Sequence, residues 1–353
     1  HASWGGQGVH CPAMNWHSFE NKRILGIAPV EEDGSAYFEV PSDKFIYFQL
    51  LDENKMMVQS MRSGTIVQSG EQTGCVGCHE NRRMALPQSP VKMPIALRRP
   101  PSKLQLPNGR PTLYSYMNEV QPVFDKHCVS CHDYGKKAAE KLNLARDRTN
   151  TFNTSYNELW RKKYIKSIGA GPSEIQKAYS WGSHASKLVK VLRAGHKDVK
   201  LTEAEFEAIV TWIDLNAPYY PRYDCAYPKN LTGRSPLNNK QLKRLSDLTK
   251  VPFSKIAAHN SNLGPQVSFD RPELSPCLQK FKDHTEPEYL EALAIIEAGS
   301  RMLKNRPRAD MSGFEACPID QRRQQQYIAR QRVELNNRRS IQDGQKLYDT
   351  PPQ

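Results

Sequence analysis

The chain has 353 residues, enough for two or three domains, and its 25 Pro and 20 Gly predict long loops. Its apolar runs are only a few residues long, which excludes a transmembrane span. The formal net charge of +13 comes without a nucleic-acid recognition motif, so nucleic-acid binding is excluded, and we expect a redox partner with an acidic surface or an anionic substrate.

Residues 23 to 75 are predicted to form β structure. Short apolar and aromatic segments at 36–40 and 45–51 are separated by turn-forming residues, which is typical of a small antiparallel sandwich. We expect this β-rich module to occupy residues 1–84. The chain begins at His1 without a secretory leader, so we expect a processed or partial chain.

Two pentapeptides have the C-x-x-C-H pattern by which c-type haem is attached. They are Cys75, Cys78 and His79 in the first copy, and Cys128, Cys131 and His132 in the second. In each, two thiols at this spacing can add to the haem vinyl groups as thioethers, and the histidine can ligate the iron. Random order would give about 0.005 such pentapeptides in a chain with this Cys and His content. Zinc would need four ligands at a compact spacing. The sequence therefore predicts two covalently bound haem c groups.

A Pro-rich stretch at 85–111 predicts an extended linker, and residues 112–222 then follow a helical pattern. Pro122 can open a helix into the second motif. Ser183 can cap a helix that Gly195 ends, and Thr202 with Glu205 forms a capping box before a closing helix. This order of elements predicts a cytochrome c domain.

Residues 223–353 form a helical C-terminal region with long loops. Thr285 to Glu288 has the capping-box pattern, and 319–348 is a polar helical stretch. Its basic residues suit partner docking or a solvated face. The overall class expected is α+β: a small antiparallel β module, a mainly α-helical cytochrome c domain and this helical region.

Four cysteines remain after haem attachment, which in an oxidising compartment suggests two disulfides. Three pairings are possible. Our preferred pairing joins Cys277 with Cys317 and Cys11 with Cys225, and buried free thiols are the alternative.

The sixth ligand decides whether a haem carries electrons or binds a substrate. For the second motif the best distal candidate is His196, on the loop before the closing helix, and His184 is the alternative. The first motif has no clear distal ligand. The candidates are His127, His1, His10, His17, Met84 and Met93. Its iron may equally be five-coordinate or take a ligand from another chain.

Several stretches resemble the C-terminal half of the hydrazine synthase alpha subunit and related dihaem proteins. They are 26–35, 75–82, 120–133, 195–220 and 307–314. The resemblance implies a bis-histidine electron-transfer haem on Cys128, Cys131 and His132, with His196 as partner. It also implies a catalytic haem at the first motif, ligated by a tyrosine four residues after the motif histidine, which itself binds zinc. Here that position is Arg83, which argues against hydrazine formation and favours iron ligation by His79.

From these features we expect a periplasmic or extracellular dihaem cytochrome that passes electrons between its haems and a partner, in a larger assembly or homo-oligomer. The alternatives are a haem enzyme acting on a small nitrogen or oxygen compound at the first motif, and a haem-bearing filament subunit.

Overall fold

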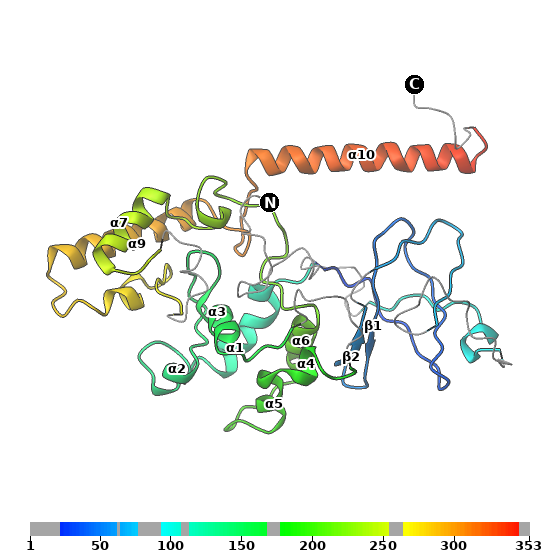
Figure 1. Ribbon diagram of the computed structural model, residues 1–353, viewed down its shortest axis with the longest axis horizontal. Coiled ribbons are helices and arrows are strands. Elements are labelled where there is room, and N and C mark those ends of the chain that lie inside the picture. Colours follow the sequence, from blue (N-terminus) through cyan, green and yellow to red (C-terminus); the bar gives the residue numbers. More distant parts are fainter. Residues whose placement is uncertain are drawn as a thin grey trace.

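The computed structural model describes residues 22–61, 64–76, 93–106, 113–167, 177–253 and 264–345 (Figure 1). A small antiparallel sheet lies at one end of the molecule and helices make up most of the rest. This arrangement agrees with the α+β class.

The β module is smaller than predicted. In its described part, β1 (Gln49–Leu51) and β2 (Met57–Ser60) pair antiparallel, with an irregularity in register between Leu50 and Leu51. The remaining pairings are isolated bridges, such as that between Ile46 and Thr65. The predicted sandwich is therefore wrong here. Phe45 and Leu50 are 56% and 44% exposed, so no second sheet covers this face.

Part of the Pro-rich stretch packs along the β module. Ile27 and Gln105 exchange two backbone hydrogen bonds of 2.8 and 2.9 Å, and a 3-10 turn forms at Ile95–Arg98. The Arg99 guanidinium lies 2.7 Å from a Glu31 carboxylate oxygen.

The middle of the chain is helical. A π-helical turn at Tyr116–Val120 runs into α1 (Gln121–His127), which has Pro122 in its first turn as predicted. The helices that follow are α2 (Lys137–Lys141), α3 (Thr154–Arg161), α4 (Gly182–Ala185), α5 (Lys187–Arg193) and α6 (Glu203–Asp214).

The two predicted caps in this region had different outcomes. The Thr202 hydroxyl accepts the Glu205 N–H at 3.2 Å, and the Glu205 carboxylate accepts the Thr202 N–H at 2.9 Å, so the capping box is confirmed. Ser183 is not a cap, because it lies inside α4 and donates its hydroxyl to Asp214 at 2.7 Å. The predicted single helix is instead broken at Ser186, where α5 begins.

An aromatic cluster fills the centre of this region. The rings of Tyr116 and Trp212 lie 4.9 Å apart, and those of Tyr156 and Tyr219 also lie 4.9 Å apart. All four side chains are at most 1% exposed. Stacking and burial of such rings anchor α6 and the π-helical turn to α3.

The C-terminal region has its own apolar core. It contains α7 (Asn239–Thr249), α9 (Pro287–Asn305) and α10 (Pro318–Gln342), with 3-10 turns at Leu231–Gly233, Pro272–Leu274 and Pro276–Leu278. The capping box predicted at Thr285 is absent. α9 starts at Pro287, Glu286 makes no side-chain cap, and the Thr285 hydroxyl bonds to Asp283 instead. Within the described ranges, no helix is both long and apolar enough to cross a membrane.

Candidate haem-binding site

The second C-x-x-C-H motif forms a tight turn at the end of α1. The Cys128 N–H donates to Phe124 at 2.8 Å, and the His132 N–H donates to the Cys128 carbonyl at 2.9 Å. The helix thus ends at the first cysteine, and the turn brings the two thiols and the histidine to one place. Cys128 is half-buried and Cys131 is exposed.

Burial raises the pKa of the Cys128 thiol to about 11, and the nearby Cys131 adds to the shift. A neutral sulfur is therefore favoured at this position. A thioether is uncharged, so covalent haem attachment fits these surroundings better than a free thiolate does.

His132 and His196 face each other. Their ring centroids are 6.0 Å apart, with the planes inclined by 44°. Two metal–nitrogen bonds of about 2 Å, with about 1 Å from each nitrogen to its ring centre, span about 6 Å. The separation is therefore that of two imidazoles on opposite sides of one metal ion.

The hydrogen bond of His132 fixes which nitrogen can reach iron. Nδ1 lies 2.7 Å from the Leu142 carbonyl oxygen, so this nitrogen carries the proton and donates it. Nε2 is left as the free ligand atom, which is the arrangement that orients metal-binding histidines.

His196 lies on an exposed loop between α5 and α6. Gly195 has a φ of +81°, a left-handed conformation that glycine adopts readily, and the Thr202 capping box fixes the other end of the loop. A pocket of about 270 Å³ opens beside His196, with an apolar lining that includes Leu192, Leu201 and Phe206. This pocket provides the apolar surface that a macrocycle edge requires.

His184, the alternative distal candidate, has a different set of contacts. Its Nε2 lies 2.9 Å from an Asp52 carboxylate oxygen, and its ring packs edge-on against Tyr179 at 4.8 Å. These contacts join α4 to the turn between β1 and β2.

A charge cluster next to His132 escaped prediction. Arg271 donates to both carboxylate oxygens of Asp133, at 2.8 and 2.6 Å, and also to Asp147. Its hydrogen bonds hold the pKa of Asp133 below its usual value. Arg271 comes from the C-terminal region and has no motif around it, so nothing in the sequence pointed to this contact.

The first motif is described only at Cys75, which is exposed. Cys78, His79 and Arg83 lie outside the described residues, as do the ligand candidates His1, His10, His17 and Met84. Of the remaining candidates, Met93 is 62% exposed, and His127 places Nε2 at 3.1 Å from Glu205.

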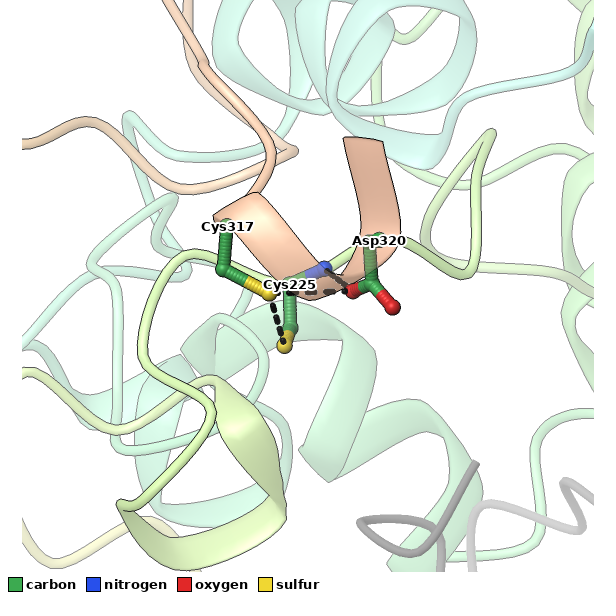
Figure 2. Close-up of side chains that lie close together, drawn as sticks. All are labelled: Cys225, Cys317 and Asp320. Atoms are coloured by element: carbon green, nitrogen blue, oxygen red, sulfur yellow. Dashed lines mark hydrogen bonds between the residues drawn. The ribbon is translucent and has the colours of Figure 1, made fainter. Parts of the chain in front are cut away.

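The cysteines are arranged differently from the preferred pairing. The Cys317 sulfur lies 3.8 Å from that of Cys225, not beside Cys277, which is buried in the C-terminal core (Figure 2). Tertiary packing between distant segments selected this neighbour, and sequence proximity was a poor guide. Cys11 lies outside the described residues, and the described cysteines are unbonded.

Comparison with known proteins supports the resemblance in the N-terminal part. Residues 1–80, less than a quarter of the chain, match the hydrazine synthase alpha subunit middle domain. A structure of Kuenenia stuttgartiensis hydrazine synthase matches with 20% identity and a TM-score of 0.41, over 55% of this chain and 33% of that chain. This chain therefore spans about a third of that one. No curated protein matches.

Proposed function

We propose that the chain is the dihaem c-type part of an extracytoplasmic redox enzyme related to hydrazine synthase. The second motif would serve electron transfer, and the first would be where a small nitrogen or oxygen compound reacts. The match of residues 1–80, which contain the first motif, favours this enzyme over the simple electron carrier expected from sequence.

The facing pair His132 and His196 carries the proposal for the second motif. Cys128 and Cys131 would hold the haem by thioethers, and the two imidazoles would ligate its iron. A bis-histidine haem supplies reversible one-electron chemistry and leaves no position for a substrate. His196 is favoured over His184 because Asp52 occupies Nε2 of His184.

The electron carrier remains the second candidate, because Arg83 stands where hydrazine synthase-like chemistry would place tyrosine. Ligation of the first iron by His79 and a second side chain would make both haems six-coordinate.

Spectroscopy of the purified chain separates the two candidates. Intact mass under denaturing conditions should first show two haem masses retained, and loss of either haem in acid-acetone would contradict covalent attachment. The EPR spectrum of the ferric protein should then contain one high-spin and one low-spin haem. Two low-spin haems would instead support the carrier.

The distal ligand has its own test. His196→Met should retain the haem, introduce a sulfur-to-iron charge-transfer band and raise the potential by part of the about 0.8 V range that axial ligands control. His184→Met is the matched control and should leave the spectrum unchanged. An unchanged low-spin spectrum and potential in His196→Met would contradict the assignment.

A further inference from the structure

Two cysteines 92 positions apart in sequence are brought together at the start of α10. Their sulfurs are 3.8 Å apart, and Figure 2 shows both side chains directed toward the same point. The backbones are also in contact, because the Cys317 N–H donates to the Cys225 carbonyl at 2.9 Å. Chains joined by such a bond have Cα atoms about 5 Å apart, inside the range of about 4.4–6.8 Å that a disulfide requires.

We propose that Cys225 and Cys317 form a disulfide that fastens the first turn of α10 to the end of the haem-bearing middle region. The two thiols would lose two protons and two electrons to an oxidised dithiol protein, whose own disulfide is reduced, and one S–S bond would form. The inference rests on the extracytoplasmic location proposed above, because that compartment supplies the oxidant.

The surroundings of the pair disfavour its reduced form. Cys317 is 1% and Cys225 8% exposed. Burial, together with Cys317 and Asp320, raises the pKa of the Cys225 thiol to about 12. Because a disulfide is easily reduced when the resulting thiolate is stabilised, a site that opposes the thiolate holds its disulfide firmly.

Zinc is the competing occupant, since Asp320 lies within ligand distance of both sulfurs. The Asp320 carboxylate is already engaged, however. One oxygen accepts the Cys225 N–H at 3.0 Å and the other lies 3.3 Å from Arg323. A structural zinc site needs four protein ligands, and among the described residues this cluster offers three.

Such a bond would matter for α10, because no side chain of this helix is buried. It would also close the chain around α7 and α9, whose apolar core lies between the two cysteines in sequence. Reduction should therefore release the base of α10 and loosen the C-terminal region.

Peptide mapping of the full chain tests the proposal. The protein is denatured without reductant, alkylated and digested. We expect the Cys225 and Cys317 peptides to be joined and unalkylated, and the native mass to rise by about 2 Da on reduction of this one bond. Recovery of both cysteines as alkylated thiols would overturn the disulfide. One zinc per chain by elemental analysis, together with those free thiols, would assign the site to a metal.

Variants supply a second readout. Cys225→Ser should make Cys317 available to alkylation, lower the Tm by several degrees and speed tryptic cleavage at Arg322 and Arg323 several-fold. Cys277→Ser, which removes another buried cysteine, should leave the joined peptide intact. Haem content is measured in parallel. Its absence would contradict the proposed function while leaving the disulfide result standing.

Discussion

At the scale of single residues, Asp214 is the carboxylate under the greatest constraint. It ends α6 and accepts the Met57 N–H at 2.9 Å, the Ser183 N–H at 2.6 Å and the Ser183 hydroxyl at 2.7 Å. Burial nevertheless raises its pKa to about 6, and the charge of Asp52 adds to the shift. The hydrogen bonds compensate only part of the lost hydration.

This shift gives the fold a pH dependence with a definite sign. Between about pH 4 and 6 the folded state binds the Asp214 proton more tightly than the unfolded chain does. The resulting stabilisation is complete below about pH 4 and is lost as the pH rises through 6. Urea midpoints from pH 4 to 7.5 should therefore fall more steeply with pH in the wild type than in Asp214→Asn.

The comparison of slopes removes the contribution of His184 and Asp52, which both proteins share. Parallel curves would show that Asp214 has an ordinary pKa in the folded state.

Sequence reasoning at this scale worked where chemistry imposes a fixed spacing. Cys128, Cys131, His132 and the glycine-preceded His196 could be selected from the chain alone, and the structure places His196 opposite His132. Arg271 could not, because an arginine has many possible partners and only tertiary packing brings it to Asp133 and Asp147.

At the scale of elements, α6 depends on its cap. Glu205, the third residue of the helix, also lies 2.7 Å from Lys126 and 3.1 Å from His127, so the cap joins α6 to α1. The capping box thus holds both the helix and the end of the loop that carries His196.

Thr202→Ala should lower the free energy of unfolding by about 1 kcal/mol, because the Glu205 N–H loses its acceptor. Thr285→Ala is the matched control, since Thr285 makes no cap and its hydroxyl bonds only to the exposed Asp283. We expect an effect within about 0.5 kcal/mol there. Equal losses in urea unfolding would show that the Thr202 cap contributes nothing specific.

The same contrast shows how far local patterns can be trusted. Thr202 and Thr285 both begin a capping-box sequence, yet only Thr202 forms the box. Pro287 starts α9 one residue too late for Thr285 to serve, because Glu286 takes the cap position. The β segments failed for another reason: alternation can predict a strand, but not whether a second sheet will cover it.

At the scale of the whole molecule, one buried ion pair connects the C-terminal region to the middle region. Arg308 and Asp310 have fully buried side chains 2.8 Å apart. Arg308 also donates to the Thr149 carbonyl at 2.7 Å, and Tyr219 donates to Asp310 at 2.8 Å. Burial opposes ionisation, but Arg308 keeps the pKa of Asp310 below its usual value.

Arg308→Met should destabilise the chain by about 3–5 kcal/mol, because Asp310 would be left buried without its main partner. Arg308→Met with Asp310→Asn should recover part of this loss, since no unpaired charge then remains. Urea unfolding of both variants measures the effect. A single variant no less stable than the double one would contradict the role of the pair.

Long-range architecture was the least accessible from sequence. The described apolar core falls into two clusters, whose members come from either side of residues 221–225. The segment 307–314 stood out only by resemblance, and its sequence gave no sign that Arg308 would enter the middle region. Such contacts depend on which buried groups need partners after the elements have packed.

α10 runs from Cys317 along one side of the molecule toward the β module, where Arg338 contacts Asp43 (Figure 1). At about 1.5 Å per residue, its 25 residues span about 37 Å. Inserting one residue would turn everything beyond it by about 100° and carry Arg338 away from Asp43. Surface helices often drift in length between relatives, but this one touches the fold at both ends. Insertions and deletions should therefore be confined to the chain beyond Arg338.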